Sequence, residues 1–324
     1  MRITIVGAGA IGGLLAARLA ESGAEVRLLA RGRTLEAIQT NGLRIATPTG
    51  IRSVSLQSEK DPVKLGLQDV VIIAVKATSL ARLIPTLAPM IGDDTAVVCA
   101  MNGIPWWFFA DPTAPHAGLR LQSLDPNGLL TDSIPARQLI GCVVHLSSKS
   151  TEPGLIEPGS GKRLILGEAL GGMSEQLLQI VALLCKAGFE ATASTAIRAE
   201  IWYKLWGNMT LNPLSAITDA TCDRLLDDPM TRQFCLDVMQ EAATIGMHIG
   251  CPLAQSGEER MQLTRQLGAF KTSMLQDVEM NKPLEIDALI GAVREIGQHI
   301  GIATPRIDYL LGTIRVFARQ KNLY

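Results

Sequence analysis

The N-terminal stretch "RITIVGAGAIGGLLAARLA" constrains the fold of this chain more than any other feature. An apolar run typical of a buried strand leads directly into G-x-G-x-x-G, which opens a helical pattern. In such a unit the first glycine permits the tight turn, the second lets a pyrophosphate approach the backbone, and the third allows close helix–strand packing. Free N–H groups at the helix N-terminus then face the phosphates. A glycine-rich turn without a ligand is the alternative. The candidate cofactor residues of this loop are Gly7, Ala8, Gly9, Ala10, Ile11 and Gly12.

Two parts of the chain differ in periodicity. Up to about residue 192, short strand patterns alternate with helical ones, which predicts a parallel sheet covered by helices. Hairpins are expected in "GLRIATPTGIRSVSLQ" and "GLIEPGSGKRLILGE". Further on, almost only helical periodicity remains. We therefore predict an α/β Rossmann-like dinucleotide-binding domain at 1–192 and an all-α domain at 193–324. The predicted helices of the second domain are 195–211, 213–226, 229–249, 253–268, 283–301 and 304–321.

Composition excludes several classes of protein. The net charge of −1 comes without a basic tract, which argues against nucleic-acid or membrane-surface binding. The six cysteines are scattered without a CxxC pair and the four histidines are dispersed, so neither a disulfide scaffold nor a metal site is expected. No run is long enough to cross a bilayer. The patterned glycines distinguish the N-terminus from a signal peptide, and we predict a cytoplasmic protein.

The residues after the second predicted strand favour NADP over NAD. An NAD site usually places Asp or Glu there to hold the ribose hydroxyls, but this strand ends "LLARGRTLE". A guanidinium can bind the 2′-phosphate of NADP bidentately, whereas a carboxylate would repel it. Arg31 adjoins the strand end and is the candidate, while Arg33 could simply be a solvated loop residue.

Two more polar residues follow predicted strands. Lys76 ends "VVIIAVKA" and Asn102 ends "AVVCAMNG". Ligands of open α/β sheets bind at the carboxyl ends of strands, so both residues are candidates for cofactor contact. A surface lysine and a turn-capping asparagine are the alternatives.

The helix predicted at 195–211 carries a polar stripe. Lys204, Asn208 and Asn212 stand at i, i+4 and i+8 and share one helix face, although the surrounding residues are apolar. The stripe is either a solvated face or the wall of a binding site. Near the end of the chain, "TSMLQDVEMNKPLEID" contains Ser273 and Glu285, which by themselves could be ordinary surface residues.

Together these motifs resemble the ketopantoate reductase (2-dehydropantoate 2-reductase) family over essentially the whole chain. The similarity rests on "GAGAIG", the arginine after the second strand, "VKA", "NG", "KLWGNMTLNPLSAI" and "TSMLQD" with "EID". The resemblance implies NADPH-dependent reduction of ketopantoate to pantoate for coenzyme A synthesis, in a cleft between a Rossmann domain and an all-α domain. It also implies that the partner is a small-molecule 2-keto acid.

The resemblance assigns roles residue by residue. Lys204 would be the catalytic lysine and proton donor, and Glu285 would act near the cofactor and the substrate hydroxyl. Asn102 would contact both cofactor and substrate, and Ser147 would touch the cofactor from a strand end. The substrate contacts would be completed by Asn208, Asn212 and Ser273.

Two departures concern the substrate side. The irregular segment 104–136 is longer than in the simplest family members, and Cys222 stands where some members carry asparagine. The aromatic run Trp106–Phe109 could roof the pocket, line a subunit interface or form core. The alternatives are therefore a reductase of another bulky 2-keto acid, a non-enzymatic NADP-binding regulator, or a 3-hydroxyacid or 6-phosphogluconate-type dehydrogenase. The helical domain could offer a homodimer face, but no heptad pattern indicates one.

Overall fold

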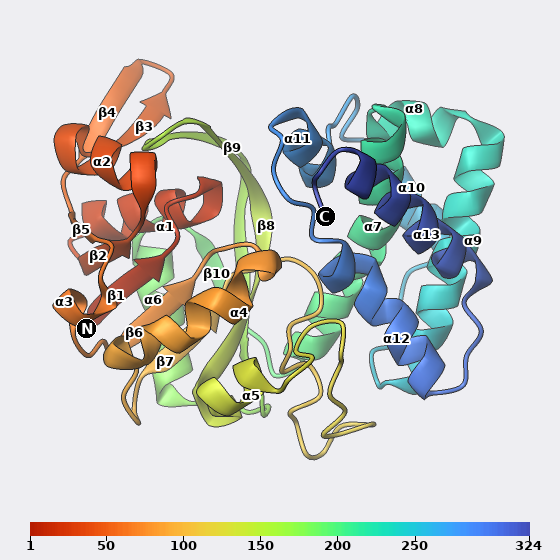
Figure 1. The fold of residues 1–324 in the computed structure, drawn as a ribbon, viewed down its shortest axis with the longest axis horizontal. Helices are drawn as coiled ribbons and strands as arrows, with labels where there is room; N and C mark the ends of the chain where they lie inside the picture. The colour runs from red at the N-terminus through yellow and green to blue at the C-terminus, as the bar shows by residue number, and fades with distance from the viewer. The chain divides into compact units, whose positions relative to one another are not determined.

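A computed structural model describes residues 1–324 (Figure 1). The strands are β1 (Arg2–Val6), β2 (Glu25–Leu29), β3 (Leu43–Thr47), β4 (Gly50–Val54), β5 (Gln57–Glu59), β6 (Val70–Ile73), β7 (Ala96–Cys99), β8 (Leu139–Glu152), β9 (Leu155–Glu168) and β10 (Glu190–Ala193). The helices are α1 (Ala10–Glu21), α2 (Gly32–Asn41), α3 (Pro62–Leu65), α4 (Leu80–Leu83), α5 (Leu129–Ser133), α6 (Glu175–Lys186), α7 (Ile197–Thr218), α8 (Cys222–Asp227), α9 (Pro229–His248), α10 (Gly257–Arg265), α11 (Ser273–Glu279), α12 (Ala292–His299) and α13 (Pro305–Gln320). Short 3₁₀ turns are η1 (Ala77–Ser79), η2 (Ile84–Met90) and η3 (Ala136–Gln138), and η4 (Asp287–Gly291) is a π-helical turn.

The chain forms two compact units. The first contains 1–101 and 129–197, and the second contains 102–128 and 198–324. All strands belong to the first unit and α8 to α13 belong to the second, as the predicted α/β plus all-α fold class requires. The sequence predicts one boundary, between 192 and 193. The structure divides the chain close to that point, but it also places 102–128 with the helices, because the aromatic side chains of this segment are buried there.

The first unit is built on one ten-stranded sheet with the order β4-β3-β9-β8-β7-β6-β1-β2-β5, and β10 pairs with β9. Strands β2, β1, β6, β7 and β8 are mutually parallel. Leu29, Val6, Ile73 and Cys99 are partners in register across four of them. The residues that follow these strand ends therefore emerge at one edge of the sheet, where open α/β sheets bind ligands.

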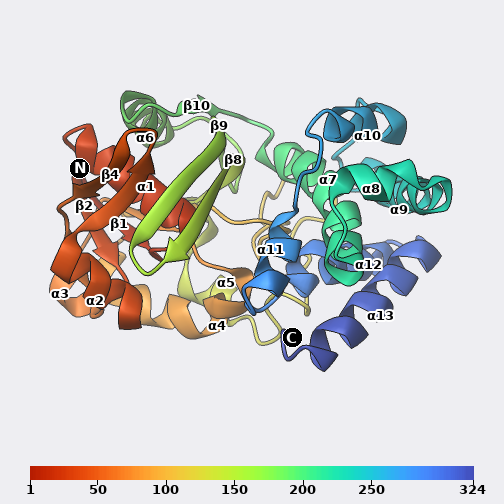
Figure 2. The ribbon, with the colours of Figure 1, turned by 90° about the horizontal axis from the view of Figure 1, so that it is seen from above.

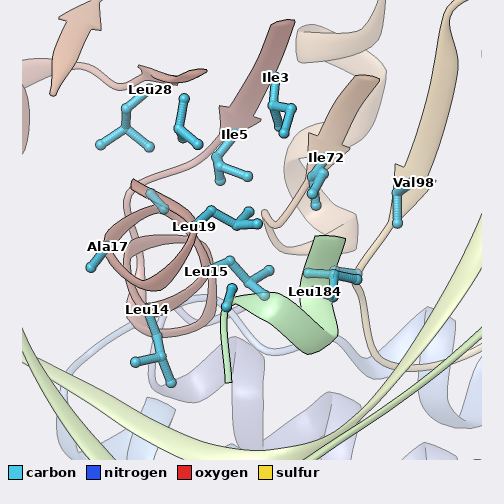
Figure 3. Packing of buried hydrophobic residues seen from close by; sticks show 14 of the residues in the cluster. Ile3, Ile5, Leu14, Leu15, Ala17, Leu19, Leu28, Ile72, Val98 and Leu184 are labelled. Carbon is cyan, nitrogen blue, oxygen red and sulfur yellow. The ribbon is translucent and has the colours of Figure 1, made fainter. Parts of the chain in front are cut away.

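Helix α1 anchors the glycine-rich loop to this sheet. Figure 3 shows its Leu15 and Leu19 side chains packed toward Ile5 of β1 and Leu184 of α6. All four side chains are almost completely buried. Burial of an aliphatic side chain of this size stabilises the fold by about 2 kcal/mol, so the start of the helix is held firmly behind the loop.

Strands β8 and β9 form one long antiparallel ribbon, seen from above in Figure 2. The sequence predicts a separate hairpin inside 154–168, and this prediction is wrong. The turn lies at Pro153–Gly154, and residues 155–168 form a single strand that pairs with β8. The Pro-Gly-Ser-Gly stretch at 158–161 has turn-forming residues but lies inside β9. It produces irregular register instead, with Gly161 at φ +79 where a Cβ would lie 2.6 Å from the His145 carbonyl oxygen.

Proline has two different effects on the predicted helices. After β6, the helical segment is divided into η1, α4 and η2, because Pro85 and Pro89 lack the N–H that a continuous α-helix needs. In contrast, Pro213 lies inside α7, which continues to Thr218, although the sequence predicts a break there. Lys204, Asn208 and Asn212 therefore all belong to one continuous helix, α7.

The second unit packs its helices around α7 and α9. Trp202 and Trp206 of α7 are 1% and 2% exposed, and the Trp206 Nε1 donates a 2.8 Å hydrogen bond to the Met239 carbonyl oxygen of α9. Helices α12 and α13 also contact α9 (Figure 1). None of the helices combines the length and the apolar character needed to span a bilayer.

Candidate active site

The glycine-rich loop has the geometry of a phosphate cradle. Gly7, at φ +103, follows β1 and donates from its N–H to the Leu29 carbonyl oxygen at 3.0 Å. A Cβ on Gly12 would lie 2.0 Å from the Gly7 carbonyl oxygen, so the loop can close on the helix only with glycine there. A Cβ on Gly9 would meet no atom within 4 Å. The protein itself does not require the absence of a side chain at Gly9, whereas an approaching ligand would.

The first turn of α1 supports the same interpretation. Gly9 is its N-cap residue and provides no side-chain cap, and no acidic residue occupies the first turn. The N-terminus thus offers its N–H groups and the positive end of the helix dipole to an external acceptor. The residues of this loop fit the diphosphate of a dinucleotide.

Arg31 follows the end of β2 and Lys76 follows the end of β6, the two strands that flank β1 in the sheet. Arg31 stands two residues after β2, is the N-cap residue of α2 and is exposed. It forms no ion pair within the chain, so its guanidinium is available to an external anion. Lys76 is the N-cap residue of η1 after β6 and is half-buried. Both residues are at the edge where the glycine-rich loop lies.

In the second unit, the structure brings Lys204 and Asn102 together. The Lys204 Nζ donates to the Asn102 Oδ1 at 2.7 Å. Lys204 and Asn208 are half-buried and Asn212 is 5% exposed, so the stripe on α7 is not a solvated face. A buried asparagine needs partners for its amide, and the Asn212 Nδ2 is 3.3 Å from the Ser273 Oγ of α11. Ser273 itself is exposed at the helix start.

The turn that carries Asn102 is fixed on the π-helical turn η4. Gly103 has φ +83, and a Cβ there would lie 2.6 Å from the Ala288 carbonyl oxygen. The next residue, Ile104, donates its N–H to that same oxygen at 2.8 Å. Only glycine allows this close approach. The backbone that directly follows Asn102 is therefore held against η4, and the Asn102 side chain accepts from Lys204.

Glu285 lies just before η4. It is half-buried, and its carbonyl oxygen accepts from the Leu289 N–H at 3.2 Å. Isolated π-helical turns are frequent at functional sites because the extra residue re-aims side chains. Ala288, whose carbonyl oxygen accepts from the Ile104 N–H, is three residues after Glu285. The segment that carries the Glu285 carboxylate therefore also holds the turn that follows Asn102.

Ser147 does not lie at a strand end, contrary to its expected place. Register pairs Cys99 at the end of β7 with Gly141, six residues before Ser147 in β8. Ser147 is instead inside the β8–β9 ribbon, where its Oγ accepts from the Ser160 N–H at 2.8 Å. The strand continues to Glu152 because β9 pairs with it along its length, which sequence periodicity alone did not indicate.

The aromatic run of segment 102–128 is core. The side chains of Trp106 to Phe109 are all 6% exposed or less. Arg198, itself 8% exposed, places its guanidinium 4.9 Å from the ring centre of Phe108 and 5.2 Å from that of Phe109. Cys222 is likewise buried, at 1% exposed. Of the roles considered for the aromatic run, the core role is therefore the one observed.

A further cation, Arg260, lies beside the stripe and is not among the residues predicted from the sequence. The Arg260 guanidinium stacks 4.7 Å from the Tyr203 ring centre, donates to its hydroxyl at 3.1 Å and forms no ion pair. It fits against Gly207, where a Cβ would lie 3.0 Å from the Arg260 Nη2. The available sequence signal was Gly207 itself, because a glycine inside a helix often marks a close packing contact.

These features define a class: an α/β unit with a dinucleotide cradle and a helical unit with a lysine–amide site, as found in two-domain oxidoreductases. Comparison with known proteins makes the class specific. The family description "Ketopantoate reductase PanE/ApbA" matches residues 3–171, and "Ketopantoate reductase PanE/ApbA C terminal" matches 196–318. The chain belongs to the ketopantoate reductase family and is an oxidoreductase.

Individual relatives are similar to this chain over nearly their full length. The 2-dehydropantoate 2-reductase of Mesorhizobium japonicum is 41% identical, with 100% of both chains covered. A crystal structure from Ralstonia solanacearum MolK2, provisionally assigned as a ketopantoate reductase, is 55% identical with a TM-score of 0.96, covering 100% of this chain and 99% of that one. The 2-dehydropantoate 2-reductase of Geobacter metallireducens GS-15 is 26% identical with a TM-score of 0.85, covering 97% and 99%. The predicted family and fold class are thereby confirmed.

Proposed function

We propose that this protein reduces 2-dehydropantoate (ketopantoate) to pantoate with NADPH, a step of coenzyme A synthesis. The observation that carries the proposal is the 2.7 Å hydrogen bond from the Lys204 Nζ to the Asn102 Oδ1. Lys204 belongs to the polar stripe of α7, which is at least half-buried. Membership of the family implies a nicotinamide cofactor and a 2-keto acid substrate.

The first unit would hold the cofactor. Gly7, Gly9 and Gly12 form the cradle for its diphosphate, and the uncapped start of α1 supplies N–H donors. Arg31, exposed and without an ion pair, supports the choice of NADPH because its guanidinium can bind a 2′-phosphate. Lys76 would add positive charge at the same strand edge. Ser147 of β8 would touch the cofactor, because a hydroxyl that accepts from the Ser160 N–H still has a second lone pair and a hydrogen.

The second unit would supply the acid. When bound, the nicotinamide supplies a hydride to the C2 carbon of the keto acid. The C2 oxygen gains negative charge as its double bond to carbon becomes single, and the Lys204 ammonium stabilises that charge and donates the proton that completes the alcohol. Asn102 accepts from the Lys204 Nζ at 2.7 Å, which orients the ammonium before substrate arrives.

The remaining polar groups would orient the substrate. Asn208 and Asn212 extend the stripe beyond Lys204 along α7, and amides can donate to oxygens without adding charge. The Ser273 Oγ, 3.3 Å from the Asn212 Nδ2, would bind the substrate carboxylate. Glu285 would accept from the substrate hydroxyl.

The test is steady-state NADPH oxidation by the purified protein with ketopantoate and a panel of other 2-keto acids. We expect ketopantoate to give the highest kcat/KM. A different preferred keto acid would retain the mechanism and change the substrate. Tight NADPH binding without turnover of any 2-keto acid would refute the proposal and favour a cofactor-binding regulator. Turnover of 3-hydroxy acids alone would favour a dehydrogenase of that class.

A further inference from the structure

A hydrogen-bonded cluster surrounds the carboxylate of Asp287, the first residue of η4. The Tyr324 hydroxyl is 3.0 Å from each of its oxygens, and the Arg315 Nη2 of α13 is 2.8 Å from Oδ1. The guanidinium groups of Arg315 and Arg319 lie 5.8 and 5.6 Å from the centre of the Tyr324 ring. The tyrosine is thus held at its hydroxyl by the carboxylate and at its ring by two cations.

The backbone next to Tyr324 holds the same segment. Asn322, at φ +57, turns the chain back after α13. The Leu323 carbonyl oxygen then accepts from the Leu284 N–H at 2.9 Å. Leu284 and Leu323 are 0% and 3% exposed, so water does not compete for this bond. Residues 322–324 therefore form a clamp on the segment 284–287.

Glu285 stands between the two attachment points of this clamp. Leu284 precedes it and Asp287 follows two residues later. Beyond Asp287, the Ala288 carbonyl oxygen accepts from Ile104, next to the turn that carries Asn102. The segment is therefore held by the clamp at its start and by the Asn102 turn at its end, which leaves little freedom for the backbone of Glu285.

We propose that Tyr324 and Asp287 are positioning residues, which keep Glu285 in the orientation that the substrate hydroxyl requires. This inference rests on the proposed function, since it assigns Glu285 to the substrate. Neither residue is expected to touch substrate or cofactor. Loss of the Tyr324 hydroxyl removes two contacts to a charged group, and such contacts contribute more than neutral hydrogen bonds do.

The test compares Tyr324→Phe with Tyr309→Phe. The control removes the hydroxyl of a tyrosine on α13 that is 68% exposed. For Tyr324→Phe we expect kcat/KM for ketopantoate to fall about tenfold, with the Kd for NADPH within about twofold of wild type. Tyr309→Phe is expected to match wild type. Asp287→Asn provides a second variant, because an amide oxygen still accepts from Tyr324 while the charge is lost.

A double-mutant cycle distinguishes positioning from general stability. If Tyr324 acts through Glu285, Tyr324→Phe should have little further effect in a Glu285→Gln background, because coupled residues are non-additive. An equal effect of Tyr324→Phe in both backgrounds would overturn the inference, as would wild-type kinetics for both Tyr324→Phe and Asp287→Asn. A wild-type protein without keto acid turnover would instead overturn the proposed function, and this inference with it.

Discussion

The Lys204 Nζ and the Asn102 Oδ1 are 2.7 Å apart, although the two residues are separated by 102 positions in the sequence. Both belong to the second unit, because the segment 102–128 leaves the α/β unit and packs with the helices. The proposed proton donor and its amide partner are therefore assembled within one unit. Pre-oriented groups of this kind lower the cost of reaching the transition state.

Substitution of Lys204 by methionine should abolish most of the catalysis. Met keeps a similar unbranched stem without the ammonium, so helix packing should be little changed. Because general acids typically contribute 10²- to 10⁴-fold, we expect kcat/KM for ketopantoate to fall by about 10³. The Kd for NADPH, followed by its fluorescence, should stay within about twofold of wild type. Lys60→Met, at an exposed lysine, serves as the control. Retained activity in Lys204→Met would rule out this residue as the proton donor.

Gly9 and Gly12 should respond differently to alanine. A Cβ at Gly9 meets nothing within 4 Å, so Gly9→Ala should melt like wild type yet bind NADPH at least about tenfold more weakly, a loss of about 1.4 kcal/mol. A Cβ at Gly12 would lie 2.0 Å from the Gly7 carbonyl oxygen, so Gly12→Ala should lower the Tm as well. Thermal unfolding and cofactor titration separate the two effects. Unimpaired cofactor binding by Gly9→Ala would contradict the assigned cradle.

Arg31→Ala should change cofactor preference. Removal of the guanidinium should weaken NADPH binding by about ten- to a hundredfold, because it removes charge-assisted bonds to the 2′-phosphate. Binding of NADH, which lacks that phosphate, should change little. Arg33→Ala is a matched control, since Arg33 is also exposed and lies two residues away. Equal losses for the two cofactors in Arg31→Ala would refute the NADP assignment.

Only one cysteine should react readily with a thiol reagent in the native protein. Cys185 is exposed, whereas Cys99, Cys142, Cys222, Cys235 and Cys251 are buried. Burial raises the pKa of Cys222 and Cys251 to about 11 and that of Cys235 to about 12. At pH 8 these thiols are protonated and unreactive as well as inaccessible. Titration with a chromogenic disulfide should count one thiol in the wild type and none in Cys185→Ser. Rapid reaction of further thiols under native conditions would show that the core opens.

Phe108→Ala should destabilise the second unit. Phe108 is 0% exposed, contacts the Phe109 ring at 5.1 Å between centres and lies 4.9 Å from the Arg198 guanidinium. Truncation of a buried phenylalanine typically costs 3–5 kcal/mol, and Arg198 would also lose a cation–π partner. Phe270→Ala, at a residue 37% exposed, should cost much less. Urea unfolding of both variants gives the comparison. Wild-type stability of Phe108→Ala would show that the aromatic run is not core.

Local patterns were sufficient for much of the fold. The glycine spacing and the strand–helix alternation predicted β1, α1 and β2. The hairpin expected in "GLRIATPTGIRSVSLQ" is formed by β3 and β4, with its turn at Pro48–Thr49. These features depend on residues close in sequence. The β8–β9 ribbon and the passage of α7 through Pro213 depend on distant partners, namely β9 along its whole length and the helices around α7. Tertiary packing overrode the turn and helix-break propensities there.

The candidate site divides in the same way. The stripe of Lys204, Asn208 and Asn212 follows from helical periodicity alone, and the structure shows that it is largely shielded from water. Its pairing with Asn102 and the contact between Asn212 and Ser273 could not follow from periodicity, because they join distant segments. Asp287 and Tyr324 carried no local signal. A tyrosine after a helix and an aspartate in a loop are ordinary until the clamp places them together.

The detour of residues 102–128 also has a consequence for biosynthesis. Phe108 and Phe109 emerge from the ribosome well before Arg198, the residue that covers their rings. At usual elongation rates this delay is on the order of ten seconds. During that time the nascent chain exposes two tryptophans and two phenylalanines in a row. Efficient production of this protein therefore depends on protection of the aromatic segment until the helices that cover it have been synthesised. Slower translation of the residues between Phe109 and Arg198 would favour aggregation.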